Sequence, residues 1–352
     1  MTEQYKYNVA VIGKTGVGKS SFINYLYGDK TCETGIGKPV TKNGFHAIET
    51  KIKGLPVTIF DSWGLEADKW KEWSADLDAE LKKRSADKPA SDWFHSVFYC
   101  IQAGGARIEP ADEKIISKLL EQHYKISVVL TKADQLTEAE EAKLTSVIQQ
   151  SFPSVSVLPV CSEGKKTRGG EVKPFGKEEV EIKAYADFFD SLIMRLPILC
   201  KSTLCKMRDE CFREVSTYVS EVGFGGFNVN EIEEKISNRL QLLLNDLHEV
   251  GKKIVNDSLV MFHYFSFSLG YQPIKKSLKN DSDNLYLYND SSVDLLSLFH
   301  RLLAGKKYVE SNLRSEIQDA ENKVNKYIDD LILDVELHLK RVKLQRLIGY
   351  SK

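Results

Sequence analysis

The sequence predicts an α/β domain with a mostly parallel sheet, followed by an all-α helical domain. Short apolar, β-branched runs alternate with helical patterns over the first half of the chain. A glycine-rich loop joins the first apolar run to the first helical pattern. After Ile198 the strand patterns stop and long amphipathic helical patterns follow. A chain of 352 residues is long enough for about two domains, which we place at residues 1–196 and 197–352.

The composition is that of an ordinary globular protein, with 42% hydrophobic and 28% charged residues. The formal net charge is −1, so no global field attracts nucleic acid or acidic membranes. The six cysteines show no C-x-x-C spacing and no histidine pattern that would complete a zinc site, so we expect reduced thiols. We see no signal peptide and no apolar run near the ~20 residues that span a bilayer. These features favour a cytoplasmic protein.

The first expected strand, at 7–12, leads into a loop of the form G-x-x-x-x-G-K-[ST] and then into a helix. Backbone N–H groups of such a loop, together with the positive end of the helix, bind phosphate. We expect Lys19 to reach the β- and γ-phosphates and Ser20 to coordinate magnesium. The expected phosphate-binding residues are Gly13, Lys14, Thr15, Gly16, Val17, Gly18, Lys19, Ser20 and Ser21.

A second magnesium ligand is expected in the loop at 28–43. Thr31, Thr34 and Thr41 are the candidates, and we prefer Thr41 because it directly precedes a strand expected at 45–52. A switch loop should end where the next strand begins, since its threonine must move onto the metal. The alternative is that Thr41 only caps the strand.

The next strand, at 55–60, ends in the sequence Asp-Ser-Trp-Gly. Asp61 can hold magnesium through water, and Gly64 can offer its N–H to the γ-phosphate. The polar helical stretch that follows contains Trp70 and Trp73, which we assign to packing rather than to a functional platform. A further strand is expected at 94–101, with helices at 112–123, 138–150 and 178–196.

The strand at 126–130 ends in Thr131-Lys132-Ala133-Asp134, which fits the guanine-reading pattern [NT]-K-x-D. The Asp134 carboxylate can accept both N1–H and N2–H of guanine, which adenine does not offer. The Lys132 stem can pack over the base. After a strand at 155–160, Ser162 and Glu163 occupy the place of a short base-contacting loop, with a partial match. We expect a solvated basic loop at 164–177.

In order and spacing, these motifs resemble the translation-factor-like P-loop GTPases over roughly residues 6–196. In detail they look like the septin, immunity-associated and chloroplast-translocon GTPases and bacterial Era-type relatives. The resemblance implies GTP or GDP and Mg2+ as ligands, and GTP hydrolysis as the activity. Gly16 stands where potassium-dependent Era-type enzymes have asparagine, so potassium activation is not expected. Leu65 stands where Ras-like enzymes have a water-orienting glutamine, so intrinsic hydrolysis should be slow.

The resembling families dimerise across the nucleotide face, and some supply an arginine in trans. Arg107 matches the position of that arginine, and the alternative is that it is a solvated or structural residue. Lys14 is expected to be exposed at the loop. The expected catalytic residues are therefore Lys19, Thr41, Gly64 and Arg107.

The second half has apolar stripes at helical spacing, at 232–254 and 313–342, which predict an antiparallel bundle or hairpin. The stretch 259–267 is rich in aromatic residues; we favour burial in a core over insertion at a membrane interface. We see no RNA-binding signature and no resemblance to a known family over 198–352.

Three functions are weighed first, and a fourth, a ribosome or RNA role, rests only on analogy with the Era-type relatives. One is a GTPase switch with an unknown protein effector. Another is a septin-like or dynamin-like protein whose output is nucleotide-dependent assembly or peripheral membrane contact. The last is a module that holds GTP without useful turnover.

Overall fold

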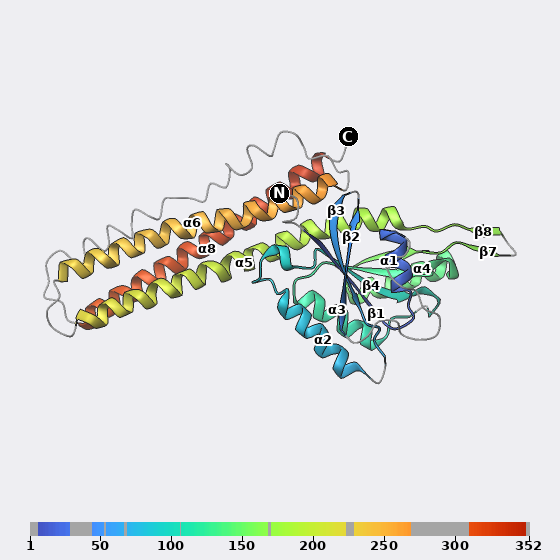
Figure 1. Ribbon diagram of the computed structural model, residues 1–352, viewed down its shortest axis with the longest axis horizontal. Helices are drawn as coiled ribbons and strands as arrows, with labels where there is room; N and C mark the ends of the chain where they lie inside the picture. The colour runs from blue at the N-terminus through green and yellow to red at the C-terminus, as the bar shows by residue number, and fades with distance from the viewer. Residues whose placement is uncertain are drawn as a thin grey trace. The chain divides into compact units, whose positions relative to one another are not determined.

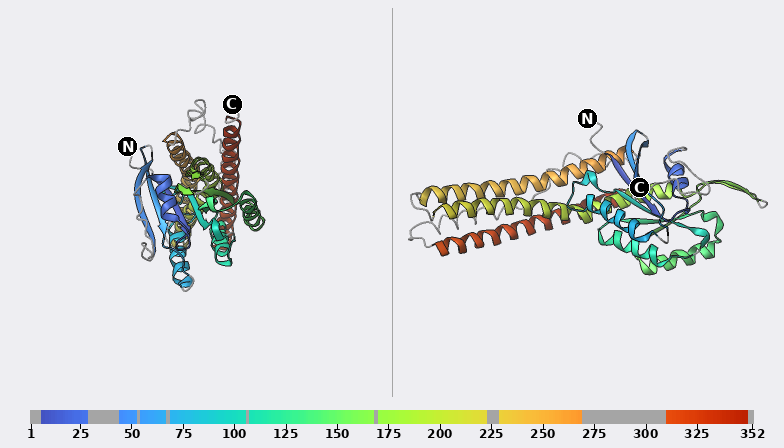
Figure 2. Two further views of the ribbon diagram at one scale, coloured as in Figure 1. Left: turned by 90° about the vertical axis from the view of Figure 1, so that its right-hand side faces the viewer. Right: turned by 60° about the horizontal axis from the view of Figure 1, so that its bottom comes forward.

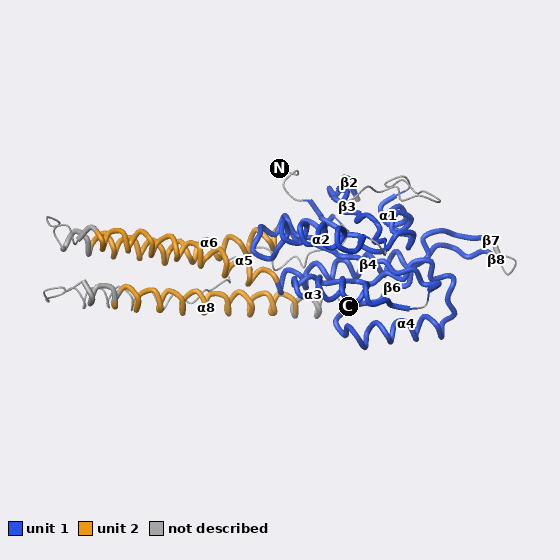
Figure 3. Tube along the Cα trace, turned by 90° about the horizontal axis from the view of Figure 1, so that it is seen from below, with its two compact units in different colours: residues 1–194, 261–272 blue, residues 195–260, 273–352 orange. Residues whose placement is uncertain are grey.

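The computed structural model describes residues 6–28, 44–52, 54–66, 69–105, 107–167, 170–222, 229–268 and 310–349 (Figure 1). It divides into two compact units, coloured separately in Figure 3: residues 1–194 with 261–272, and residues 195–260 with 273–352. The three threonines considered as magnesium ligands, Thr31, Thr34 and Thr41, lie outside the described residues.

The first unit is built on a six-stranded sheet with the order β2-β3-β1-β4-β5-β6. Strand β2 runs antiparallel to β3, and the remaining neighbours are parallel. The mostly parallel α/β fold is therefore confirmed. The strands are β1 (Tyr7–Gly13), β2 (Phe45–Ile52), β3 (Leu55–Ser62), β4 (Ser96–Gln102), β5 (Ile126–Thr131) and β6 (Ser156–Val160).

Helices of the first unit follow the strands in the order expected from the sequence. They are α1 (Lys19–Tyr27), α2 (Trp70–Lys83), α3 (Pro110–Glu121), α4 (Glu138–Ser151) and the first part of α5 (Lys177–Val222). Helix α3 begins earlier than the expected residue 112, because Pro110 occupies its first turn and Glu109 with Asp112 forms a capping box.

The parallel register brings the carboxyl ends of five strands to one edge of the sheet, where ligands of open α/β sheets bind. Gly13 at the end of β1 lies beside Cys100 of β4, and Val11 lies beside Asp61 of β3. Thr131 at the end of β5 pairs with Val160 of β6. The phosphate-binding loop, the Asp61–Gly64 segment, the Thr131–Asp134 turn and the Ser162–Glu163 pair follow these strands, so they meet at this edge.

A two-stranded hairpin, β7 (Lys165–Thr167) with β8 (Gly170–Val172), follows β6. The segment at 164–177, expected to be a solvated basic loop, thus contains two short paired strands, and its Lys165 and Lys173 side chains are exposed, as a solvated segment requires. Backbone pairing continues between Cys161 and Phe175, whose N–H and C=O groups exchange hydrogen bonds of 3.2 and 3.0 Å. This pairing fixes both ends of the hairpin segment beside β6.

The tryptophans of α2 pack as expected and hold the segment after β3. Trp73 is buried, and its Nε1–H donates to the Trp63 carbonyl at 2.8 Å. The Nε1–H of Trp63 donates to Asp76 at 3.1 Å. The rings of Trp70 and Trp73 stack with their centroids 6.3 Å apart. The described segment from Asp61 to residue 66 is thus anchored on an aromatic cluster.

Helix α6 (Val229–Ser268) contributes its last turns to the first unit. Phe265 is buried there, with its ring 5.4 Å from that of Tyr7 and 5.6 Å from that of Phe188. Phe262 lies 5.2 Å from Phe188. Core burial is therefore confirmed for these two side chains, whereas Phe267 is 71% exposed. Among the described helices, none is long and apolar enough to cross a bilayer.

The second unit consists, over its described residues, of the rest of α5, most of α6, and α8 (Glu310–Gly349), which lie side by side in Figure 2. Among their described side chains, most of the apolar stripes of α6 and α8 are buried, for example Leu243 and Leu247 of α6 and Val324 and Leu339 of α8. Helix α5 pairs with α8 through Lys201 and Asp329 at 2.9 Å, and with α6 through Glu214 and Arg239. The all-α architecture expected for the second half is confirmed over its described residues.

Candidate nucleotide-binding site

The loop between β1 and α1 has the backbone of a phosphate-binding loop. Gly16 and Gly18 have φ values of 77° and 96°, in the left-handed region that favours glycine. A Cβ atom at Gly13 would lie 2.5 Å from the carbonyl oxygen of Cys100, so no side chain fits there. Gly18 is the residue before the first turn of α1, whose N–H groups open toward the loop.

Lys19 lies inside this loop, as expected. Its side chain is buried, and the ammonium donates to the carbonyl oxygens of Gly13 and Lys14, each at 3.0 Å. Burial lowers the pKa of Lys19, although the nearby Asp61 acts to raise it. The loop therefore holds a desolvated cation that a phosphate would neutralise.

Asp61 fits the expected role of a magnesium ligand. It is 4% exposed, and its Oδ1 atom has no hydrogen-bond partner among the described residues. Burial raises the pKa of Asp61 to about 6, while Lys19 and His46 act to lower it. A buried, unpartnered carboxylate oxygen is a group that a hard cation or its bound water satisfies. Asp61 and Ser20 would hold the ion, since Mg2+ commonly uses one or two protein ligands together with the substrate's phosphates.

The Gly64 segment lies directly against the phosphate-binding loop. A Cβ atom on Gly64 would be 2.5 Å from Thr15 Cα, and the Thr15 N–H donates to the Leu65 carbonyl at 3.4 Å. The Leu65 side chain is buried in the hydrophobic core with Trp73. It therefore packs away from solvent and offers no polar atom to a water molecule.

The Lys14 side chain is not the exposed group expected from the sequence. Its ammonium lies 2.8 Å from Glu109 Oε2 and 2.8 Å from Asp112 Oδ2, at the start of α3. Burial acts to lower the pKa of Lys14, but these two carboxylates outweigh it and raise the pKa. Glu109 also pairs with Arg107 at 3.3 Å, and the Arg107 side chain is 76% exposed. Lys14 can therefore contact a phosphate only through its backbone in this arrangement.

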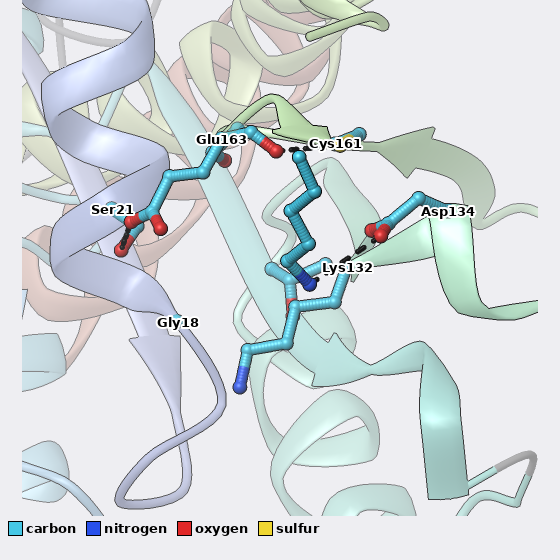
Figure 4. A pocket seen from close by; sticks show the side chains of 9 residues that line it. Gly18, Ser21, Lys132, Asp134, Cys161 and Glu163 are labelled. Carbon is cyan, nitrogen blue, oxygen red and sulfur yellow. Dashed lines mark hydrogen bonds and ion pairs between the residues drawn. The ribbon is translucent and has the colours of Figure 1, made fainter. Parts of the chain in front are cut away.

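The carboxyl end of β5 contacts the phosphate-binding loop and borders a pocket. The Thr131 hydroxyl donates to the carbonyl oxygen of Val17, and to that of Ile101 at 3.3 Å. Lys132 takes a left-handed φ of 55°, and its ammonium lies 3.5 Å from Gln102 Oε1. The pocket beside them is lined by Gly18, Ser21, Thr131, Lys132, Asp134, Cys161, Ser162, Glu163 and Lys165 (Figure 4).

Residues 8–132 match the family described as 50S ribosome-binding GTPase. The first unit has a G domain of the translation-factor-like P-loop GTPase class. The resemblance expected from the motifs is confirmed.

The relatives that match the G domain are distant. Cell division control protein 10 of Saccharomyces cerevisiae is 25% identical, over 45% of this chain and 57% of the relative. GTPase Era of Vibrio cholerae is 24% identical, over 45% of this chain and 47% of the relative. Among solved structures, Toc33 from Arabidopsis thaliana in complex with Mg2+ and GMPPNP shares 18% identity, with a TM-score of 0.39, over 54% of this chain and 86% of that one. The matched part of this chain spans about half the length of these two curated relatives.

Two features of the G domain were missed by the sequence reasoning. The acidic start of α3 captures Lys14, and the only sequence signal for it is the capping box formed with Asp112. Lys165, expected in a solvated loop, also lines the pocket beside Asp134. Ser162 and Glu163, expected from a partial match, do line that pocket.

Proposed function

We propose that this protein is a magnesium-dependent nucleotide switch that binds GTP and hydrolyses it slowly to GDP and phosphate. The observation that supports it is the meeting of three groups at one sheet edge. Lys19 lies in the phosphate-binding loop, Asp61 has a buried oxygen with no hydrogen-bond partner in the described part of the chain, and Asp134 lines a pocket beside the loop. These groups suit triphosphate, metal and guanine respectively.

In this proposal the loop Gly13–Ser20 binds the phosphates through its N–H groups and Lys19. The metal, when bound, neutralises the phosphate charge, and it would be held by Ser20, Asp61 and Thr41. Gly64 lies close enough to the loop for its segment to respond to the γ-phosphate. The helical unit would supply the contacts to an effector.

Hydrolysis is proposed to be slow because residue 65 has no polar side chain. Leu65 is buried with the core of the sheet and cannot orient a water molecule. Efficient turnover then needs a group from a partner or an activator, since such a group can be worth roughly 10³ in rate or more.

Phosphate release from GTP tests the proposal directly. With Mg2+ we expect turnover on the order of 10⁻⁴ to 10⁻³ s⁻¹, as in unassisted switches, and its loss in excess EDTA. Released phosphate is measured over hours, with ATP in parallel reactions. Binding of GTP without any release would favour the module without turnover, and equal use of ATP would contradict the guanine assignment.

Arg107 gives a second proposal, a homodimer across the nucleotide face. Its guanidinium is largely exposed and tied only to Glu109 among the ion pairs of the described residues. If a partner copy uses this arginine, turnover per enzyme should rise with protein concentration, and Arg107→Ala should abolish the rise. Lys143→Ala, an exposed cation on α4, serves as the charge-matched control. A flat concentration dependence in the unmodified protein would exclude this role for Arg107.

A further inference from the structure

In the pocket of Figure 4, an ammonium group already contacts Asp134, the carboxylate proposed to bind guanine. The Lys165 ammonium lies 3.4 Å from Asp134 Oδ2, and the two side chains are 47% and 8% exposed. Lys165 is the first residue of β7 and follows closely on Cys161, Ser162 and Glu163, which also line the pocket. Figure 4 labels Asp134 at the edge of the pocket, where a dashed line ends on its carboxylate.

This contact uses Oδ2, one of the two carboxylate oxygens that guanine would need. An ionised carboxylate is an acceptor with two oxygens, and guanine offers it two N–H donors in one plane. Asp134 is nearly buried, so little room remains for the base while an ammonium stays on Oδ2. Entry of guanine between these groups therefore requires Lys165 to withdraw.

We propose that Lys165 is a specificity-determining residue that competes with guanine for Asp134. This inference rests on the proposed function, since it assumes that Asp134 binds the base. Lys165 holds the carboxylate in the nucleotide-free protein and leaves for solvent when guanine enters. Because the lysine is half-exposed, the ion pair is weak, and the competition reduces guanine affinity by a few-fold only.

The same segment is tied to the opposite side of the pocket. Glu163 Oε1 accepts a hydrogen bond of 2.8 Å from the Ser21 hydroxyl on α1, and both residues are labelled in Figure 4. The segment from Cys161 to Lys165 thus contacts the α1 side through Glu163 and the Asp134 side through Lys165. Withdrawal of Lys165 frees the Asp134 side while the Glu163 contact can persist.

The proposal predicts that removing Lys165 changes guanine nucleotide affinity in the direction opposite to the one expected from simple electrostatics. Removing a cation near a polyphosphate site ordinarily weakens binding of any nucleotide. Removing a cation that competes with the base tightens binding, and does so only for a base that pairs with Asp134. Adenine has neither N–H donor at these positions, so adenine nucleotides gain nothing.

The experiment compares Lys165→Gln with the unmodified full-length protein by calorimetric titration with GDP and with ADP. We expect GDP to bind about two- to fivefold more tightly to the variant, and ADP to bind no more tightly. Lys173→Gln, an exposed lysine on the same hairpin segment, controls for the general loss of charge and should not tighten GDP binding.

Two results overturn the inference in distinguishable ways. If the unmodified protein binds GDP no better than ADP, the proposed function fails together with this inference. If it prefers GDP but Lys165→Gln binds GDP equally or more weakly, this inference alone fails. A weaker affinity would instead make Lys165 a ligand of the bound base.

Discussion

Replacing Lys19 with alanine is expected to weaken GTP binding by about 100-fold. The ammonium is buried in the loop and bonded to two of its carbonyl oxygens, so it is already positioned for phosphate oxygens. A hydrogen bond to a charged group contributes about 1.5–3 kcal/mol, and a lysine between two phosphates makes more than one. Equilibrium binding of a fluorescent GTP analogue measures the loss.

Lys14→Ala is the matched control for this prediction. It removes the same charge from the same loop, but its ammonium is held by Glu109 and Asp112 rather than inside the loop. We expect an effect of less than about tenfold, provided that thermal unfolding shows both variants folded. Equal losses in the two variants would mean that general positive charge, and not the position of Lys19, binds the phosphates.

Asp134→Asn is expected to lower GDP affinity by about 10³-fold. The asparagine amide would place an N–H donor against the two donors of guanine at a nearly buried position, and each unsatisfied buried donor costs about 1–3 kcal/mol. Xanthosine diphosphate has a carbonyl oxygen in place of the guanine amino group, so the variant should bind it more tightly than the unmodified protein does.

Competition titrations with GDP and xanthosine diphosphate measure both changes. Asp78→Asn, which removes an exposed carboxylate that pairs with Lys118 on the surface, should change neither affinity. An Asp134→Asn variant that retains its GDP affinity and gains none for xanthosine diphosphate would show that the base binds elsewhere.

The sequence predicts the sheet edge well because its motifs are local. The loop, the Asp61 segment and the Thr131–Asp134 turn each follow an apolar strand directly, and parallel strands bring such ends together. Leu65 is a similar case, since a missing polar group is visible in the sequence itself. The structure adds that Leu65 is buried in the core, so a small movement of this residue would not open its place to a polar group.

Contacts between distant segments could not be predicted from these patterns. Lys14 pairs with Glu109, and Lys165 pairs with Asp134. The loops that bring these residues together carry no periodic sequence pattern from which their conformation could be predicted. The pairing of Phe265 with Tyr7 joins residues from opposite ends of the first unit's chain. Apolar spacing predicts that Phe265 is buried in a helix, but it contains no information on which surface the helix covers.

That last contact has a consequence for synthesis of the chain. The first unit needs Phe262 and Phe265 beside Phe188, so its packing is incomplete when residue 196 has been made. At roughly 5–20 residues per second, ribosomes add the stretch from 197 to 268 in about 4–15 s. During this interval an aromatic surface of the nascent G domain stays uncovered. A fragment ending at residue 196 would keep that surface permanently, and we expect it to aggregate or to recruit chaperones where the full chain does not.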